Sequence, residues 1–254
     1  MKSPALEFAG YRTDFSTQDG GGMIEERIFS DREKLAEALA SSVADSLISG
    51  LEARERASLV VSGGSTPGPF FARLRTLELA WERVTITLAD ERWVDPSSDA
   101  SNERLVRETL LQDRAATAGF VPLKTPDSTP EEAGQEVVGR LAPHLPFEVV
   151  VLGMGGDGHT ASLFPCDRRQ NAAIWDGEES GTLVVPGYPE TAPHPRLSLT
   201  PRALLDCRRL ILHITGDAKR EVYRRAQRPG PVQELPIRCV LHQEQRDVEV
   251  YWAP

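Results

Sequence analysis

The 254-residue sequence has few cysteines, no long apolar run and no Lys/Arg run of the kind that a nucleic-acid-binding protein shows. Its three cysteines, Cys166, Cys207 and Cys239, are widely spaced and form no C-x-x-C pair, which indicates free thiols in a reducing compartment. No apolar stretch approaches the roughly 18 residues of a membrane span, and the N-terminus lacks the apolar core of a signal peptide. We therefore expect a cytoplasmic protein that does not contact a membrane.

Positive charge is also scarce, because the formal net charge is −9 and no run of Lys and Arg occurs. A nucleic-acid-binding protein ordinarily presents a basic face, so no nucleic-acid partner is expected. An acidic surface does not attract anions from a distance, so an anionic substrate requires a locally positive site. The five histidines show no H-x-x-x-H or similar spacing, and no metal site is predicted.

Apolar, β-branched segments alternate with amphipathic segments along most of the chain. Strands are predicted within residues 58–61, 83–93, 147–153, 181–189, 194–201, 208–216 and 246–254, the last as an edge strand. Helices are predicted within residues 31–57, 67–77, 101–112, 129–145 and 217–227, opened by caps such as Ser30 or Asp31 and Thr129. This order predicts an α/β fold with a mostly parallel central sheet, helices on both faces and room for a small antiparallel annex.

The domain organisation follows from the same pattern. Residues 1–22 end in "DGGG" and are expected to form a poorly ordered arm with a short strand at best. Residues 23–254 are expected to form a single domain, in which only the stretches 10–22 and 186–195 resemble linkers.

Residues 148–164 read "EVVVLGMGGDGHTASLF", in which three glycines after a strand spell G-x-G-x-x-G. A dinucleotide site is not predicted, because Pro165 follows too soon for the required helix and the acid Glu178 lies in a polar loop. His159 in this loop is a candidate general base, since imidazole titrates near ~6.5. The alternative is a histidine that only satisfies loop carbonyls.

A second glycine loop, "SGGSTPG", follows the strand at 58–61. It lacks the Lys and Ser/Thr of a nucleotide-binding P-loop. Gly63 and Gly64 can turn backbone N–H groups toward a ligand, Ser65 and Thr66 add hydroxyl donors, and the next helix begins there. The loop is therefore either a phosphate cradle or a tight turn with an N-cap.

The segment "LADERWVD" places Asp90, Glu91 and Arg92 at the end of another strand. Ligands bind at the carboxyl ends of strands in open α/β sheets, so these charges are candidate site residues. The alternative is a solvated turn that contains an internal ion pair.

Together, six segments resemble the 6-phosphogluconolactonase family, which shares a superfamily with glucosamine-6-phosphate deaminase. They are, in order, "SGGSTP", "LADERWVD", "SNERLVRETLL", "VVVLGMGGDGHTASLFP", "PRLSLTPRALLDCRRLILHITGDAKREVYRRA" and "LPIRCVLH". The resemblance runs from about residue 25 to the C-terminus, and "GMGGDGHTASLFP" is its most specific part. It implies a Rossmann-like sheet and cofactor-free hydrolysis of 6-phosphoglucono-δ-lactone, a sugar-phosphate lactone, in the pentose phosphate pathway.

The resemblance also implies roles for individual residues. The catalytic histidine of the family falls on His159, which would deprotonate the attacking water, so activity is expected to fall below about pH 6. Asp157 would orient the loop or His159. Arg92 or the backbone N–H groups of the glycine loop would stabilise the oxyanion.

The phosphate-binding positions of the family fall in segments that are far apart in the sequence. Gly63, Gly64, Ser65 and Thr66 form the cradle, while Arg196 in "PRLSLT" and Lys219 in "GDAK" supply positive charge. Lys219 near a helix start is unfavourable for the helix dipole, which is more understandable if an anion binds there. Either cation alone is otherwise an ordinary surface charge.

Two rival functions remain. Amino-sugar phosphate deaminases resemble "DGHIAFNEP" and "DEY", whereas this chain has Leu163 and Phe164 in place of Asn and Glu, and Arg92 in place of Tyr. A sugar-phosphate-binding regulator would keep the cradle but usually lose the base, and His159 is present. We expect a hydrolase that is a monomer or a weak dimer.

Overall fold

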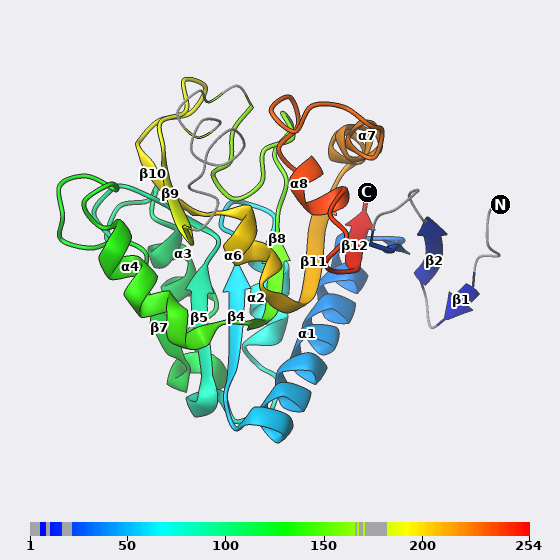
Figure 1. Cartoon of the computed structure of the whole chain (residues 1–254). Helices are drawn as coiled ribbons and strands as arrows, with labels where there is room; N and C mark the ends of the chain where they lie inside the picture. Colours follow the sequence, from blue (N-terminus) through cyan, green and yellow to red (C-terminus); the bar gives the residue numbers. More distant parts are fainter. Residues whose placement is uncertain (1–5, 9–10, 17–21, 166, 168–169, 171–181) are drawn as a thin grey trace.

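The computed structural model describes residues 6–8, 11–16, 22–165, 167, 170 and 182–254. These residues form a nine-stranded sheet and a three-stranded sheet. The large sheet contains, in spatial order, β1 (Leu6–Phe8), β2 (Tyr11–Ser16), β3 (Ile24–Phe29), β12 (Val248–Ala253), β11 (Cys207–Thr215), β8 (Phe147–Leu152), β4 (Ala57–Val61), β5 (Val84–Leu88) and β7 (Gly119–Val121). In this spatial order, each pair of neighbouring strands between β3 and β7 is parallel (Figure 1). The mostly parallel sheet is confirmed.

The small sheet is the predicted antiparallel annex. It contains β6 (Asp90–Arg92), β10 (Arg196–Leu199) and β9 (Val184–Gly187), in that order. In β10, Arg196 pairs with Arg92 of β6 and Gly187 of β9. The annex therefore carries two predicted site residues on neighbouring strands.

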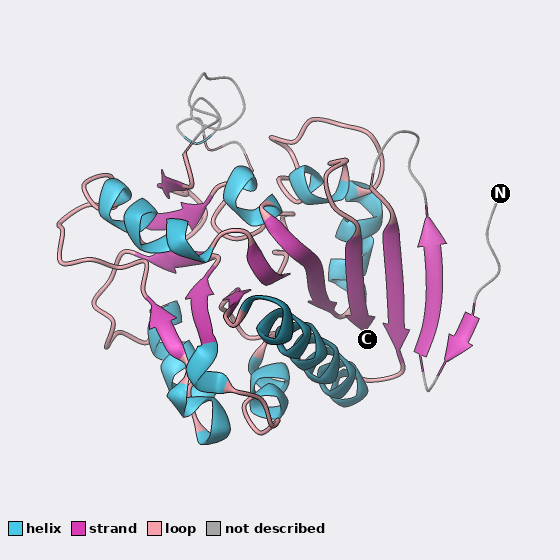
Figure 2. Ribbon diagram, turned by 60° about the horizontal axis from the view of Figure 1, so that its bottom comes forward, coloured by secondary structure: helices cyan, strands magenta, loops and turns pink. Residues whose placement is uncertain are grey.

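Helices connect the parallel strands and cover both faces of the large sheet. They are α1 (Arg32–Arg54), α2 (Gly68–Leu74), α3 (Asn102–Thr109), α4 (Gly134–Leu141), α6 (Pro201–Leu205), α7 (Asp217–Ala226) and α8 (Arg238–Leu241), with 3₁₀ turns η1 (Trp81–Arg83), η2 (Asp113–Thr117) and η3 (Ala142–His144). The crossover β3–α1–β4 and the crossover β11–α7–β12 run in opposite directions along the sheet. Because such crossovers are right-handed, α1 and α7 lie on opposite faces. Figure 2 shows α1 crossing one face.

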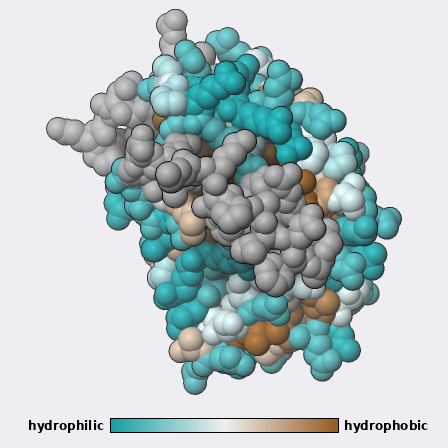
Figure 3. Space-filling model, turned by 90° about the vertical axis from the view of Figure 1, so that its right-hand side faces the viewer, coloured by the Kyte–Doolittle hydropathy of each residue, from teal (hydrophilic) through white to brown (hydrophobic). Residues whose placement is uncertain are grey.

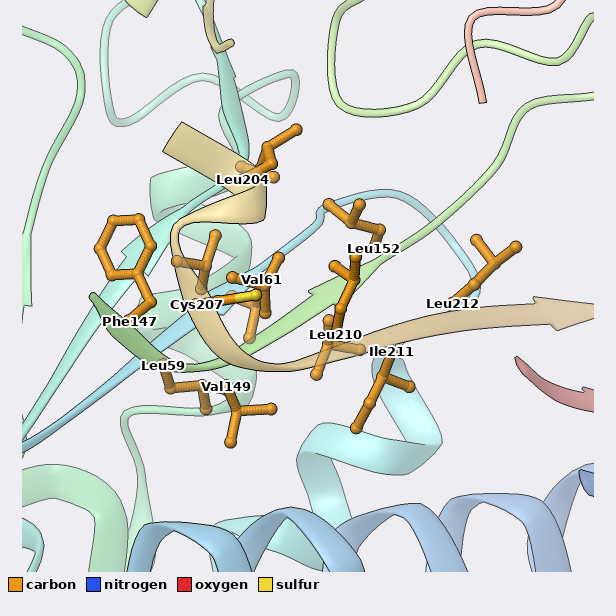
Figure 4. Packing of buried hydrophobic residues seen from close by; sticks show 14 of the residues in the cluster. Leu59, Val61, Phe147, Val149, Leu152, Leu204, Cys207, Leu210, Ile211 and Leu212 are labelled. Carbon is orange, nitrogen blue, oxygen red and sulfur yellow. The ribbon is translucent and has the colours of Figure 1, made fainter. Parts of the chain in front are cut away.

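The core lies between α1 and the central strands. Every residue of β4 and β8 is buried, as expected for strands that are covered on both faces. Leu59, Val149 and Ile211 come from three adjacent strands and project toward α1 (Figure 4). The start of α1 is confirmed, because the Asp31 side chain accepts a hydrogen bond from the Lys34 N–H.

Shortening Leu39 to alanine tests this packing. Leu39 lies on α1 and is fully buried, so Leu39→Ala is expected to lower the free energy of unfolding by about 2–5 kcal/mol. Urea denaturation measures this change. The control, Glu37→Ala on the exposed side of the helix, should stay within about 0.5 kcal/mol of the wild type. Equal effects of the two substitutions would contradict the assigned helix face.

The prediction that the last strand lies at an edge is wrong. β12 lies inside the sheet, parallel to β11 on one side and to β3 on the other. Its alternating pattern includes Glu249, which forms ion pairs with Arg209 and Arg27 instead of facing solvent. Because charged side chains are paired under α1, β12 has the alternation of polar and apolar residues that is typical of a strand with one exposed face.

Two further expectations need correction. Thr129 does exchange hydrogen bonds with Glu132, but residues 129–133 form turns, and α4 begins only at Gly134. The N-terminal arm contributes more than one short strand, because β1 pairs with β2 and β2 pairs with β3, both antiparallel. The arm thus extends the sheet at the β3 edge.

No helix among the described residues is long and apolar enough to cross a membrane. Outside the grey atoms, the face in Figure 3 is mainly hydrophilic, with small hydrophobic patches. Cys207 and Cys239 are free thiols, and burial raises the pKa of each to about 12. Cys166 lies outside the described residues.

Candidate active site

A cavity of about 320 Å³ lies at the carboxyl ends of the central strands. Its lining includes Val61 at the end of β4 and Leu152 at the end of β8. Of the residues to which the resemblance assigns a role, all but Asp157 line it, namely Gly63, Gly64, Ser65, Thr66, Arg92, His159, Arg196 and Lys219. Asp157 does not line the cavity but contacts His159. The fold therefore brings together residues that are up to 156 positions apart (219 − 63).

His159 and Asp157 form a hydrogen-bonded pair at one side of this cavity. The His159 Nδ1 and the Asp157 Oδ1 are 2.6 Å apart, and the His159 backbone N–H donates to the same oxygen at 3.1 Å. Burial alone would raise the pKa of Asp157, but these hydrogen bonds and the charge of His159 hold it below its usual value. The carboxylate can only accept, so Nδ1 carries the proton and Nε2 is left free to act as a base.

Two glycines of the G-x-G-x-x-G pattern allow the loop to fold around the histidine. A Cβ at Gly155 would overlap the His159 imidazole and the Asp157 carboxylate, so only glycine lets the loop fold back on itself. Gly158 has φ +84°, a left-handed conformation, and lies against Leu235. Residues 159–165 form no α-helix, so the dinucleotide interpretation is excluded for this loop.

The loop from Gly63 to Thr66 lines the same cavity as His159. Within the described part of the chain, the backbone N–H groups of Gly63, Gly64, Ser65 and Thr66 donate to no other group. Gly64 and Ser65 are exposed, and α2 begins directly after Pro67. Consecutive N–H groups that lack protein acceptors are typical of an anion-binding loop.

Lys219 adds a positive charge to this loop. It lies in the first turn of α7, and its Nζ donates to the Thr66 Oγ1 at 3.4 Å. Burial, and then the charge of Arg32, lower the pKa of Lys219. Among the described residues no carboxylate forms an ion pair with Lys219. An anion beside the ammonium would stabilise its charged form and so oppose both the burial and the repulsion by Arg32.

Arg196 forms the wall next to the histidine loop. It is 7% exposed, and its Nη1 lies 3.8 Å from the Asp90 Oδ2, which also accepts from the Ser162 Oγ at 2.5 Å. The Arg196 guanidinium lies over the Phe164 ring at 5.2 Å, and the same ring packs against His159 at 4.6 Å. Arg196 is thus held close to the base.

The DER segment is a strand and not a solvated turn. Glu91 caps α3, because it accepts from the backbone N–H groups of Asn102 and Glu103 at 2.8 and 2.7 Å. Burial raises the pKa of Glu91 although these hydrogen bonds oppose the shift. Arg92 donates to the Ala100 carbonyl at 2.6 Å, while its buried Nε has no partner within the described residues. Glu91 is therefore structural, whereas Arg92 retains capacity to bind a ligand.

Two cavity residues were not predicted. The Asn102 amide packs on Gly63 and donates to the Asp90 carbonyl at 2.9 Å. His213 on β11 lines the cavity, and burial lowers its pKa to about 3, so it is neutral. Asn102 is identifiable only as part of the motif "SNERLV", whereas nothing in the local sequence marks His213. No group of His, Cys, Asp and Glu suited to a metal ion occurs in the described residues.

Comparisons with known proteins identify relatives of this chain. Residues 30–252 match the family model of glucosamine-6-phosphate isomerases/6-phosphogluconolactonase. A Rhizobium meliloti protein named 6-phosphogluconolactonase is 46% identical over 228 residues, which is 89% of this chain and 97% of the relative. The crystal structure of a 6-phosphogluconolactonase from Shewanella baltica has a TM-score of 0.86 at 45% identity, covering 90% and 97% of the two chains. A monomeric glucosamine-6-phosphate deaminase, 17% identical with a TM-score of 0.70, shares the fold.

Proposed function

Because the chain belongs to the family of glucosamine-6-phosphate isomerases and 6-phosphogluconolactonases, we propose that it hydrolyses 6-phosphoglucono-δ-lactone to 6-phosphogluconate. The observation that carries the proposal is the pairing of two features in one cavity. His159, which is paired with Asp157, and a loop of unpaired N–H groups beside Lys219 line the same cavity. This arrangement suits a substrate with a phosphate at one end and an ester carbonyl at the other.

In the proposed reaction His159 is the general base. Its Nε2 takes a proton from a water molecule whose oxygen forms a bond to the lactone carbon C1. The bond from C1 to the ring oxygen then breaks, and the imidazolium returns its proton to that oxygen, which leaves a hydroxyl group and a carboxylic acid that loses its proton to solvent. Asp157 holds the Nδ1 proton and stabilises the imidazolium while it exists.

The negative charge that forms on the carbonyl oxygen requires a donor. Arg92 is one candidate, because its buried Nε has no partner within the described residues. The Gly156 backbone N–H is the second candidate, since it lines the same cavity and donates to no described group. Both would act by preorganised electrostatic stabilisation. Arg196 and Lys219 are proposed to bind the anionic end of the substrate, with Lys219 at the cradle.

A deaminase function is less well supported. Leu163 and Phe164 replace the Asn and Glu of that group, so no acid for ring opening is present at these positions. Both side chains are also almost fully buried. The proposed role is a step of the pentose phosphate pathway, carried out by a cytoplasmic monomer or weak dimer that uses neither a metal nor another cofactor.

Replacing Asp157 by asparagine tests the orientation of the base. Asp157→Asn keeps the shape of the side chain but removes the carboxylate that fixes the His159 tautomer, so kcat is expected to fall about 10²- to 10⁴-fold with little change in KM. Steady-state kinetics measure this split. Asp45→Asn, an exposed carboxylate on α1, is the control and should leave both constants unchanged.

The proposed function is tested with freshly prepared 6-phosphoglucono-δ-lactone, with product read by a coupled 6-phosphogluconate dehydrogenase. Because the lactone also hydrolyses spontaneously, each rate is compared with an enzyme-free blank. Turnover well above the blank, with no ammonia released from glucosamine 6-phosphate, is expected. Ammonia release in place of lactone turnover would replace this function by a deaminase.

A further inference from the structure

The loop that carries His159 is held from outside by one distant segment of the chain. The Ile237 N–H donates to the Gly158 carbonyl at 2.9 Å, next to His159 in sequence. The side chain of Leu235 covers Gly158 so closely that a Cβ there would lie 2.5 Å from the Leu235 Cδ2. The position of His159 therefore depends on residues 235–237.

Arg238 anchors that segment. Its side chain is buried, and its Nη1 donates to the Pro231 carbonyl at 2.8 Å. The guanidinium packs flat against Gly230, where an added Cβ would lie 2.6 Å from Nη1. The Arg238 backbone N–H donates to the Leu235 carbonyl at 2.9 Å. One side chain thus joins both ends of residues 230–238 and fixes the stretch between them.

A buried guanidinium at this place is not explained by charge pairing. The acid that approaches Arg238 is Glu234, at 3.7 Å and largely exposed, while the buried Nε of Arg238 has no partner within the described residues. Burying a charged group with one donor unsatisfied is unfavourable, so its retention needs a function. The hydrogen bond to the Pro231 carbonyl and the packing on Gly230 supply that function, because they fix the conformation of residues 230–238.

We propose that Arg238 is a positioning residue for catalysis, which acts through Leu235 and Ile237 to hold His159 in its reactive place. The inference rests on the proposed function, because it treats His159 as the base. Arg238 does not line the cavity, so it acts on the base without touching the substrate. It should therefore affect the chemical step and leave the binding of the phosphate to the Gly63–Thr66 loop unchanged.

The test is Arg238→Ala, assayed with and without added guanidinium ion. A misplacement of the base by about 1 Å lowers rates on the order of 10²-fold, so kcat should fall 10- to 10²-fold with KM within about threefold. Millimolar guanidinium, which fits the space left by the side chain, should restore part of kcat. Arg209→Ala, which removes a guanidinium bonded to Ser42 and Glu249 under α1, is the control and should show loss of thermal stability without loss of kcat.

A second pair of variants tests the Ile237 hydrogen bond directly. Ile237 has φ −56°, which suits proline, so Ile237→Pro removes its N–H while Ile237→Val retains it. The proposal expects the proline variant to lose kcat and the valine variant to keep it. Normal kcat in both Arg238→Ala and Ile237→Pro would overturn the proposal.

Imidazole NMR separates this inference from the proposed function. If the wild type fails to hydrolyse the lactone, the proposed function fails, but the His159 Nδ1–H signal still reports the geometry of the pair with Asp157. That signal should shift in Arg238→Ala and return with guanidinium. An unchanged signal would overturn the positioning role whatever the activity.

Discussion

Replacing His159 by alanine is expected to lower kcat for 6-phosphoglucono-δ-lactone by about 10²- to 10⁴-fold, the usual contribution of a general base. The pair with Asp157 leaves the His159 Nε2 as the free ring nitrogen beside the cavity, and the substitution removes it. Enzyme-catalysed rates must be corrected for spontaneous hydrolysis. Binding of 6-phosphogluconate, measured by calorimetry, should change only a few-fold because the cradle is intact.

His144→Ala is the matched control for this substitution. His144 ends η3 just before β8, at the edge of the sheet opposite the cavity. Its loss should leave kcat at the wild-type value. If His159→Ala instead keeps a kcat similar to that of the wild type, another group is the base and the proposed mechanism is wrong.

Removing Lys219 is expected to weaken recognition of the phosphate. Lys219→Ala should raise KM for the phosphorylated lactone about 10- to 10²-fold, because a hydrogen bond between charged groups is lost. Hydrolysis of unphosphorylated glucono-δ-lactone should change little. The ratio of kcat/KM for the two lactones measures the effect without interference from changes in folding.

The neighbouring cation supplies the control. Arg220 also lies on α7, but its guanidinium packs on the Trp252 ring at 3.9 Å and does not line the cavity. Arg220→Ala should therefore leave the ratio unchanged. Arg196→Ala should lower the ratio in the same direction as Lys219→Ala, because Arg196 is also proposed to bind the anionic end of the substrate. A normal ratio in Lys219→Ala would remove Lys219 from the phosphate site.

Most of the fold followed from local pattern, and the exceptions have physical causes. Parallel strands such as β4 and β8 are continuous apolar runs with helices between them, so they were predictable. The prediction of an edge position for β12 is wrong because Glu249, which suggested an exposed face, forms ion pairs with Arg209 and Arg27 inside the structure. A single sequence contains no information on such partners, which lie far away in the chain.

The candidate site was predictable where motif and backbone chemistry coincide. His159 could be singled out as a candidate base because it follows the three glycines of the G-x-G-x-x-G pattern in one short segment, whereas the need for glycine at position 155 appears only in the loop conformation. His213 was missed because its local sequence is that of an ordinary strand, and only the fold places it at the cavity. Arg238 lies within the motif "LPIRCVLH", but the motif does not predict its role, because its contacts with Gly230 and Pro231 require a loop conformation that the sequence does not reveal.

The central claim is that one cavity binds the phosphate at the Gly63–Thr66 loop and presents the substrate carbonyl to His159. A crystal structure with bound 6-phosphogluconate tests it most directly. We predict that the phosphate accepts hydrogen bonds from the loop N–H groups and from Lys219, with the C1 carboxylate beside the His159 Nε2. A product bound in the reverse orientation, or outside this cavity, would contradict the account.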